Sequence, residues 1–532
     1  MEPAQLIELQ AKRHHKPMDD LIAQGGSPVQ QFYSGTTVFV TGGSGFLGKQ
    51  LIEKLLRSCA IKKIYLLTRS KKGKTIQERL EVMLTQPVFD RLREKQPQFA
   101  DKIVPVVGDV ADIKLGLSDS DWTVLTEEVD IIFHEAATVR FDEPLRKATL
   151  TNVRGTRETL ELARQCAHLK MFVHVSTAFS HATEDRIDGD VDEQFYPSPV
   201  PPHTMIALAE QTDVTRLDNI TKHLIQGWPN TYTFTKAISE ELIKTYAGDL
   251  PVCIVRPSIV TPAYFEPNPG WLDIHTLMGP SGVYFGSGLG VLRVFLTDVN
   301  SNLAMAPVDY VNNATIAAAW DSTERQKNGQ ADIPVYNVAR NLRYGLIGDT
   351  MRESRKLFCT PKAVWYTETL ETKSKYLYWL LSWFYHYIPA YFVDLVFKLL
   401  GKKPPQGLDS FVDVYRKVDK LADIYNYFLT NEWNFIDNNT KAMVARMSDA
   451  DKLIFNCDLS NIDFIEFIRV WGIGLRRYIL NDGLVGTVAA NKKQTILFFV
   501  HYSIVAAYIY LIWFIISTVF IFSKYVWSSF VI

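Results

Sequence analysis

A glycine-rich turn near the N-terminus restricts the fold more than any other stretch. The sequence TTVFVTGGSGFLGKQLIEKLL, residues 36–56, reads as a β-rich strand, a tight turn and a helix. It satisfies two overlapping patterns, Gly42-x-x-Gly45-x-x-Gly48 and Gly43-x-Gly45-x-x-Gly48. Glycine permits the turn and lets the backbone approach a pyrophosphate, whose charge the helix N-terminus receives. The stretch therefore predicts a dinucleotide-binding βα unit. The expected contacts are Gly42, Gly45, Phe46, Leu47 and Gly48.

The strand that follows this unit ends in basic residues. KKIYLLTRS, residues 62–70, ends near Arg69, and Lys71 and Lys72 come next. An acidic residue at this strand tip binds the ribose hydroxyl of NAD, whereas cations suit the 2′-phosphate of NADP. The pattern therefore favours NADPH, with Arg69 as a contact. The alternative is a solvated basic turn without a ligand.

Further apolar strands alternate with helical patterns. KIVPVVGDV, VDIIFHEAATV, KMFVHVSTAFS and VCIVRPSIV are continuous apolar stretches, separated by patterns such as LRKATLTNVRGTRETLELARQC. This alternation is typical of an α/β fold with a Rossmann-type, doubly wound parallel sheet covered on both faces. Ligands bind at the carboxyl ends of such strands. The further cofactor contacts expected there are Asp109, Val110, Ala136, Ala137 and Pro257.

A tyrosine and a lysine one helical turn apart form a candidate catalytic pair. In NTYTFTKAISEELIKTYAG, residues 230–248, Tyr232 precedes Lys236 by four positions, so the two side chains share a helix face. An ammonium beside a phenol lowers the phenol pKa, which makes tyrosine usable as a proton donor and acceptor near neutral pH. The alternative is an ordinary surface pair.

Charge and cysteine usage exclude several classes of function. Lys and Arg total 57 against 58 for Asp and Glu, so no net charge attracts nucleic acid. The five cysteines have no paired spacing that would chelate zinc or build a disulfide framework, which fits a reducing compartment, and no metal site is predicted. Residues 1–34 form a polar segment without the apolar core of a secretory signal, which predicts synthesis in the cytosol.

An apolar segment close to the C-terminus is long enough to cross a bilayer. Residues 495–523 carry no formal charge, with Lys492 and Lys493 before them and Lys524 after them. They predict a single-pass C-terminal transmembrane helix, contacting membrane lipid, with the catalytic body in the cytosol. The alternative is a hydrophobic hairpin lying in one leaflet.

Between these regions the pattern becomes helical and aromatic. We expect an NADPH-binding extended Rossmann domain with substrate-binding insertions over residues 35–345, followed by a mainly helical domain over residues 360–482. GKKPPQGLDS, residues 401–410, reads as a loop inside the helical domain. The apolar run at 376–400 is interrupted by Pro389 and Asp394, which favours a buried or membrane-lying helix pair over a membrane span.

These motifs together resemble a known family. TGGSGFLG, HVSTAF, YTFTK and VRPSIV look like an extended short-chain dehydrogenase/reductase. GWPNTYTFTKAISE, RPSIVTPAYFEPNPGWLD, GPSG, PVDYVNN, NEWNFIDNN and GLRRYIL make the chain similar, over about residues 33 to 482, to the alcohol-forming, membrane-associated fatty acyl-CoA reductases. Two departures affect chain-length preference and packing rather than chemistry. ARNLRYGLIGD replaces a Pro-Ile-Thr-Trp type sequence, and Phe464 stands where members often carry tryptophan.

The resemblance implies a reaction and roles for particular residues. The family reduces a long-chain acyl-CoA with two NADPH to a fatty alcohol and free CoA, and its C-terminal helical region is the sterile domain. Tyr232 is then the proton donor, and Lys236 holds the nicotinamide ribose and keeps the Tyr232 pKa low. Thr177 is the hydroxyl that fixes the substrate oxygen, with Ser176 as the alternative. One site would reduce the thioester to an aldehyde and then the aldehyde to the alcohol.

Three further expectations concern the acyl-binding groove, the membrane and the rival functions. The acyl chain is expected in a groove formed by residues 258–300 and the helical domain. The endoplasmic reticulum is the expected membrane, with the peroxisome or lipid droplet as alternatives, and the oligomeric state is not predicted. The rival functions are an extended reductase acting on a steroid or other lipid carbonyl, and a non-catalytic NADPH-binding membrane scaffold.

Overall fold

The structure is a computed structural model of the chain. It describes residues 1–70, 73–277, 279–403 and 409–530. Lys71 and Lys72 of the expected basic strand tip, and residues 404–408 of the expected loop, lie outside the described residues.

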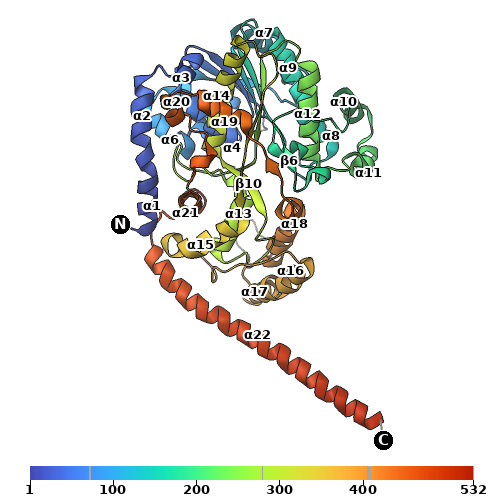
Figure 1. Ribbon diagram of the computed structural model, residues 1–532. Coiled ribbons are helices and arrows are strands. Elements are labelled where there is room, and N and C mark those ends of the chain that lie inside the picture. The colour runs from blue at the N-terminus through green and yellow to red at the C-terminus, as the bar shows by residue number, and fades with distance from the viewer. Residues whose placement is uncertain (71–72, 278, 404–408, 531–532) are drawn as a thin grey trace.

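A seven-stranded sheet forms the centre of the N-terminal domain, as the α/β pattern predicts (Figure 1). Its strand order is β11-β7-β5-β4-β1-β2-β3, and every neighbouring pair is parallel. The order reverses at β1, so a crevice forms there at the carboxyl ends of the strands. The strands are β1 (Thr37–Thr41), β2 (Lys63–Thr68), β3 (Ile103–Val107), β4 (Ile131–His134), β5 (Met171–Val175), β7 (Val252–Pro257) and β11 (Val335–Val338).

Helices cover both faces of this sheet. In β1, Val38 and Val40 belong to one hydrophobic core and Phe39 to the other, because successive strand residues point to opposite faces. One face is covered by α4 (Phe46–Ser58) and α14 (Val308–Lys327), and the other by α7 (Asp119–Glu128), α9 (Gly155–Gln165) and α12 (Thr231–Tyr246). Further helices of this region are α5 (Ile76–Leu84), α6 (Asp90–Lys95), α8 (Leu145–Ala148), α10 (Pro202–Gln211) and α11 (Val214–Leu224).

The N-terminal polar segment is folded. It forms α1 (Pro3–Ala11), α2 (His15–Gln24) and α3 (Pro28–Tyr33). The buried Tyr33 hydroxyl donates to the carbonyl of Ile316 in α14 at 2.9 Å, and the N–H of Val29 donates to the Asp451 carboxylate at 3.3 Å. These helices therefore tie the sheet domain to the C-terminal domain.

The C-terminal region is mainly helical and shares small sheets with the rest. Its helices are α15 (Tyr344–Phe358), α16 (Lys375–Ser382), α17 (Ile388–Leu399), α18 (Phe411–Thr430), α19 (Asn438–Arg446), α20 (Asp449–Ile454) and α21 (Phe464–Gly474), with α13 (Pro280–Leu289) packed nearby. The small sheets are β8 (Ile259–Thr261), β10 (Asn302–Pro307) and β12 (Arg340–Arg343); β9 (Val294–Leu296) with β13 (Leu370–Thr372); and β6 (Asp190–Val191) with β14 (Asn434–Phe435). Each two-stranded pair joins segments far apart in the sequence.

The two departures from the family pattern meet in this region. Arg340, at the start of β12, places its guanidinium over the ring of Phe464 at 4.7 Å from the ring centroid. A cation over an aromatic face is an attractive contact. The unusual residues therefore pack against each other, away from the sheet edge.

The C-terminus is one long exposed helix. Helix α22 (Thr487–Phe530) leaves the lower end of the body in Figure 1 and extends away from it. Residues Thr487–Trp527 are long and apolar enough to span a membrane, and the expected 495–523 segment lies within them. Its first turns still contact the body, since Lys493 Nζ donates to the carbonyl of Pro361 at 3.0 Å and Gln494 donates to that of Trp365 at 3.1 Å. The helix is a candidate membrane anchor.

Candidate active site

The predicted site residues come together along one edge of the sheet. The glycine turn follows β1, Arg69 follows β2, Asp109 follows β3, and Ala136 and Ala137 follow β4. Ser176 and Thr177 follow β5, and Pro257 ends β7. In a parallel sheet these carboxyl ends share one edge, which is where the doubly wound fold binds its ligands.

The glycine turn is shaped for close backbone approach. A Cβ on Gly42, whose φ is +80°, would lie 2.7 Å from the amide nitrogen of Ala136, and a Cβ on Gly48 would lie 2.3 Å from Gly43 Cα. Side chains are therefore excluded where the turn, the helix and β4 meet. Gly45 is exposed and begins α4 without a side-chain cap, which leaves the helix N-terminus accessible. This cradle fits a dinucleotide pyrophosphate.

Among the described residues, the tip of β2 is basic. Arg69 is exposed and lies 3.9 Å from the carboxylate of Asp109 at the end of β3. Arg79, from α5, donates to the backbone carbonyl of Arg69. Two guanidinium groups thus stand at the strand tip where a ribose phosphate would lie.

Tyr232, Thr177 and Lys236 surround the end of β5. Asn230 caps α12 by accepting from the N–H of Thr233 at 2.9 Å, so Tyr232 stands in the first turn of the helix. The Thr177 hydroxyl lies close enough to the Tyr232 phenol to lower its pKa; it donates to the carbonyl of Pro257 at 3.4 Å and accepts from the N–H of Phe179 at 3.2 Å. Lys236 lies one turn later and donates to the carbonyl of Val175 at 2.8 Å. A carbonyl oxygen between the two hydroxyls would have two hydrogen-bond donors.

The expected low pKa of Tyr232 is wrong for this structure. Partial burial raises the pKa of Tyr232 to about 12, and the nearby Thr177 hydroxyl only partly offsets this. The Lys236 ammonium is directed to the carbonyl of Val175 instead of the phenol. Burial also lowers the pKa of Lys236 to about 8, although Glu240 and Glu135 favour its charged form. Tyr232 is therefore protonated at neutral pH, the state that a proton donor needs.

Ser176 faces away from Tyr232 into a buried carboxylate network. Its hydroxyl donates to Glu240 at 2.5 Å, and Ser180 and His181 contact the same carboxylate at 3.1 Å. Arg256 on β7 donates to both Glu240 oxygens, at 3.0 and 2.6 Å. These contacts hold the Glu240 pKa well below its usual range, against burial. The neighbouring Thr177 hydroxyl has a different partner, the carbonyl of Pro257 at 3.4 Å, so the two hydroxyls do not share one contact.

An aromatic wall encloses Tyr232 on the side of the C-terminal domain. Phe141 stacks on Tyr232 with ring centroids 6.1 Å apart and an interplanar angle of 16°. Tyr425 and Phe428, both from α18, each lie 5.4 Å from Phe141. Lys420 of the same helix pairs with Asp142 at 3.0 Å. Helix α18 therefore closes the catalytic residues off from water on one side.

Comparisons with known proteins place the chain in a family. The NAD-binding model described as male sterility protein matches residues 40–315, and the sterile model, also described as male sterility protein, matches residues 385–482. Fatty acyl-CoA reductase wat of Drosophila melanogaster is 37% identical over 492 residues, covering 91% of each chain. Fatty acyl-CoA reductase 1 of Rattus norvegicus is 36% identical over 497 residues, covering 91% of this chain and 92% of the relative. The chain belongs to the fatty acyl-CoA reductase family. It is an oxidoreductase with a nicotinamide-cofactor site.

Solved structures agree with this family at the level of the fold. The terminal R domain of the myxalamid PKS-NRPS pathway has a TM-score of 0.56 at 21% identity and covers 84% of this chain and 92% of its own. The reductase domain of a nonribosomal peptide synthetase from Mycobacterium tuberculosis has a TM-score of 0.52 at 18% identity and covers 88% and 96%. Both are reductase domains, and they share the overall fold of this chain.

This member of the fatty acyl-CoA reductase family has two buried acidic residues at the site that sequence reasoning missed. Glu240 continues the helix face of Tyr232 and Lys236 by one more turn, so the same four-residue spacing could have revealed it. Glu135 follows β4, and neither of its buried carboxylate oxygens has a hydrogen-bond partner among the described residues. Burial raises the Glu135 pKa to about 8, although Lys236 lowers it. Its position beside the glycine turn gives no sequence signal of this burial.

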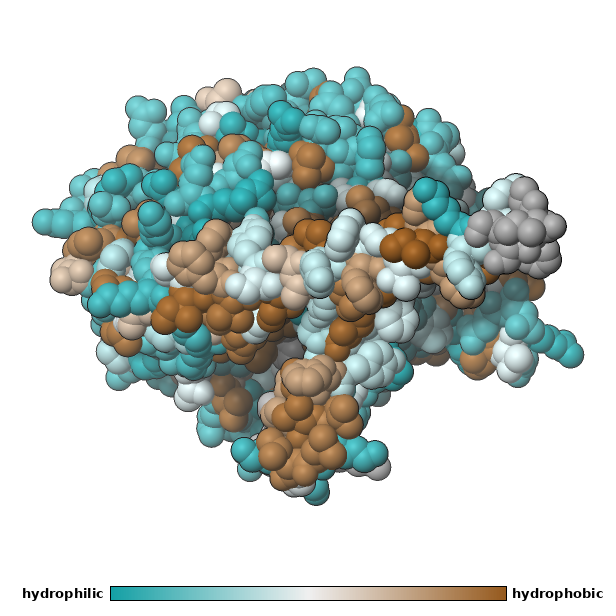
Figure 2. Space-filling model, turned by 90° about the horizontal axis from the view of Figure 1, so that it is seen from below, coloured by the Kyte–Doolittle hydropathy of each residue, from teal (hydrophilic) through white to brown (hydrophobic). Residues whose placement is uncertain are grey.

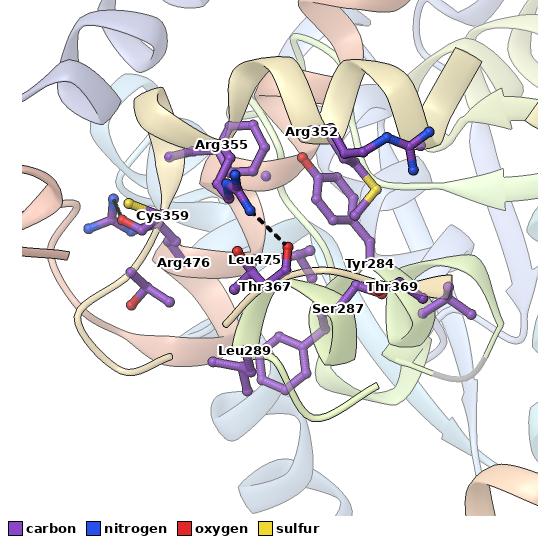
Figure 3. Close-up of a pocket in the computed structure, with 18 of the residues that line it drawn as sticks. Tyr284, Ser287, Leu289, Arg352, Arg355, Cys359, Thr367, Thr369, Leu475 and Arg476 are labelled. Atoms are coloured by element: carbon purple, nitrogen blue, oxygen red, sulfur yellow. Dashed lines mark hydrogen bonds between the residues drawn. The ribbon is translucent and has the colours of Figure 1, made fainter. Parts of the chain in front are cut away.

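A cavity lies between α13, α15 and α21 in this reductase (Figure 3). The cavity volume is about 80 Å³, and the cavity opens to solvent. Its wall is mostly apolar, and Arg355 crosses one side to donate to the carbonyl of Thr367 at 3.3 Å. The apolar lining includes Tyr284, Leu289, Met351, Phe358, Leu475 and Leu480.

Proposed function

We propose that the protein reduces a long-chain acyl-CoA to a fatty alcohol and free CoA with NADPH, through a bound aldehyde. The observation that carries this proposal is the placement of the Tyr232 and Thr177 hydroxyls together at the carboxyl edge of the cofactor sheet, with Lys236 on the next turn. Membership in a family of fatty acyl-CoA reductases supports the substrate class.

In the first reduction the protein's own groups stabilise the substrate oxygen. Thr177 and Tyr232 would both donate to the thioester carbonyl oxygen, and Tyr232 transfers its proton as negative charge develops there. Bound NADPH supplies the hydride to the carbonyl carbon. The resulting hemithioacetal would return its hydroxyl proton to the Tyr232 phenolate as CoA thiolate leaves, and an aldehyde remains. Lys236, on the same face of α12, holds the nicotinamide ribose and can return a proton to the tyrosinate.

The second reduction uses the same groups on the aldehyde. A second NADPH must replace NADP while the aldehyde stays bound, so the site must shield the aldehyde from water. The aromatic wall formed by Phe141, Tyr425 and Phe428 is suited to this. Tyr232 then donates a proton to the aldehyde oxygen and the alcohol forms. The reaction consumes two NADPH for each CoA released.

The tip of β2 supports NADPH as the proposed cofactor. Arg69 and Arg79 supply positive charge there, and Asp109 is already engaged with Arg69. Guanidinium groups suit a 2′-phosphate, whereas a free carboxylate would suit the ribose hydroxyls of NAD. The proposed cofactor contacts are Gly42, Gly45, Phe46, Leu47, Gly48, Arg69, Asp109, Val110, Ala136, Ala137, Lys236 and Pro257.

The acyl chain would lie in the apolar cavity between α13, α15 and α21. This cavity is lined by residues of the 258–300 segment and of the helical region, which were expected to form the acyl groove. An apolar wall suits a hydrocarbon chain because the chain gains free energy for each methylene that leaves water.

Helix α22 would anchor the enzyme with its catalytic body in the cytosol, with the endoplasmic reticulum as the proposed membrane. Deletion of residues 495–532 should convert the protein from carbonate-resistant to carbonate-extractable. If the shortened protein still resisted carbonate, α22 would not be the integral anchor. Microscopy of the tagged full chain against endoplasmic reticulum, peroxisome and lipid-droplet markers identifies the organelle.

The deciding experiment measures NADPH oxidation by membranes that contain the full chain. Acyl-CoAs of several lengths are supplied and the products are identified by gas chromatography. Fatty alcohol at two NADPH per CoA is expected, with Tyr232→Phe reducing the rate by about 10²- to 10⁴-fold. Aldehyde as the end product would refute the second step. Turnover of a steroid but of no acyl-CoA would refute the substrate class.

A further inference from the structure

We propose that α16 and α17, residues 375–400, lie flat on the bilayer as a second membrane-contacting element beside α22. The hairpin consists of α16, a π-helical turn at Trp383–Tyr387, and α17. In a surface helix pair of a soluble protein the apolar face packs inward. In this hairpin a large apolar face points outward instead.

The polar groups of this hairpin face the protein. Tyr378 and Tyr387 both donate to the Asp419 carboxylate on α18, the former at 2.6 Å. The buried His386 ring accepts from the N–H groups of Arg293 and Val294 at 3.0 and 3.2 Å.

Asp394, the acidic residue that interrupts the apolar run, is also turned inward. Its two carboxylate oxygens accept from the N–H groups of Phe411 and Val412 at 2.9 and 3.2 Å, at the start of α18. A carboxylate on the outer face would oppose insertion into lipid, and this one is engaged with the protein.

The opposite face of the hairpin is large, apolar and exposed. Tyr376 is 89% exposed, Trp379 64%, Phe392 65% and Leu399 77%. Leu377, Leu380, Trp383, Ile388, Tyr391, Leu395 and Leu400 are also exposed. Contiguous patches of this kind are rare on soluble monomers and mark an interaction surface. Figure 2, which views the molecule from below, shows brown hydrophobic patches on this side of the body.

The position of the hairpin identifies the membrane as its partner. Phe384 packs on Tyr508 and Tyr385 packs on His501, each with ring centroids 5.9 Å apart, so the hairpin touches the apolar helix α22. Both also lie at the lower end of the body in Figure 1. A bilayer that contains α22 would therefore meet the exposed face of the hairpin as well.

The composition of the hairpin fits the interfacial region of a bilayer. Tryptophan and tyrosine prefer that region, and lysines near helix ends reach the lipid headgroups. Exposed lysines flank the hairpin at Lys373 and Lys375 on one side and at Lys398, Lys402 and Lys403 on the other. The pattern is that of an interfacial amphipathic element, separate from the spanning helix.

The test uses the full chain, with its five native cysteines replaced by alanine, reconstituted in phosphatidylcholine vesicles with an environment-sensitive fluorophore on one introduced cysteine. Phe392→Cys reports the hairpin, Tyr510→Cys reports α22, and Val82→Cys, at an exposed apolar position on α5, is the aqueous control. The label at 392 should be quenched by lipids carrying a shallow nitroxide, at least about threefold more than the label at 82, and shielded from aqueous iodide. The label at 510 should respond to a deeper nitroxide.

Two outcomes would overturn the proposal. Iodide quenching at 392 equal to that at 82 would mean that the hairpin stays in water. Shielding from iodide without quenching by labelled lipid would mean that a protein surface, such as a second copy, covers it. Quenching is measured only on protein shown to be folded, either by its acyl-CoA reduction or, if the proposed function is wrong, by its NADPH binding. The membrane contact of the hairpin and the proposed function can therefore be refuted independently.

Discussion

Arg256 donates to both carboxylate oxygens of Glu240 in a place where neither side chain reaches solvent. This pair joins α12 to β7. Lys236 and Tyr232 precede Glu240 by one and two turns on the same helix face. The ion pair therefore helps to fix where the Tyr232 phenol and the Lys236 ammonium, the proposed catalytic groups, stand relative to the ends of β5 and β7.

Glu240→Gln should destabilise the protein by about 3–5 kcal/mol, because the buried Arg256 charge loses its partner. Thermal unfolding of the full chain in detergent measures this. The neighbouring Glu241→Gln removes an exposed pair with Lys244 and should cost less than about 1 kcal/mol. Equal effects of the two variants would contradict the structural role of Glu240.

Thr177→Val should lower kcat with acyl-CoA by about 10²-fold, because the substrate oxygen loses one hydrogen-bond donor. Ser176→Ala should leave kcat within about threefold and cost about 1 kcal/mol of stability, since only the bond to Glu240 is lost. Single-turnover rates on both variants decide between the hydroxyls. The reverse ranking would identify Ser176 as the catalytic residue.

The activity should fall as the pH rises through about 8. Burial lowers the pKa of Lys236 to about 8, so the ammonium that holds the ribose is lost above that pH, while Tyr232 with a pKa of about 12 stays protonated. The kcat/KM profile from about pH 6 to 10 should therefore show one descending limb. Lys244→Gln, on the exposed part of α12, should leave the profile unchanged. A flat profile to pH 10 would exclude this assignment.

Glu135 should make the cofactor-free protein less stable as the pH rises. Burial raises its folded pKa from 4.5 to about 8, so its contribution is fully present below 4.5 and is lost as the pH rises through about 8. Glu135→Gln should flatten the decline in Tm and gain on the order of 2 kcal/mol at about pH 8. The exposed Glu94→Gln serves as the control. An unchanged pH dependence in Glu135→Gln would contradict the burial of this carboxyl.

Gly288→Phe should shorten the accepted acyl chain. Gly288 lines the cavity between α13, α15 and α21, and a Cβ there would meet no atom within 4 Å, so the new ring can enter the cavity. We expect kcat/KM for a sixteen-carbon acyl-CoA to fall roughly tenfold relative to an eight-carbon one. Gly288→Ala is the matched control and should keep the ratio. An unchanged ratio in Gly288→Phe would place the chain elsewhere.

Much of the fold could be predicted because local sequence patterns determine its strands and turns. Each sheet strand is a continuous apolar stretch, and the glycine turn allows one arrangement of β1 and α4. The ends of parallel strands then share an edge by geometry, so the list of candidate residues followed without a structure. The long apolar helix was equally visible from its length and lack of charge.

The features that could not be predicted depend on contacts between residues far apart in the sequence. The N-terminal segment reads as polar, yet Tyr33 is buried against a carbonyl 283 residues away. The pKa of Tyr232 was predicted in the wrong direction because burial raises it, and because the Lys236 ammonium donates to the Val175 carbonyl, a contact that helical spacing does not show. The burial of Glu135 likewise results from packing around β4 that no local pattern records.

Helix α18 belongs to the C-terminal region, yet Tyr425 and Phe428 pack on Phe141, which in turn stacks on Tyr232. The surroundings of Tyr232 are thus formed jointly by two regions that family models match separately. Exchanging the C-terminal region between relatives would also exchange the aromatic side chains that cover Phe141. If Tyr232 is the proton donor, as proposed, sequence changes in α18 would alter the wall of the site and leave α12 unchanged.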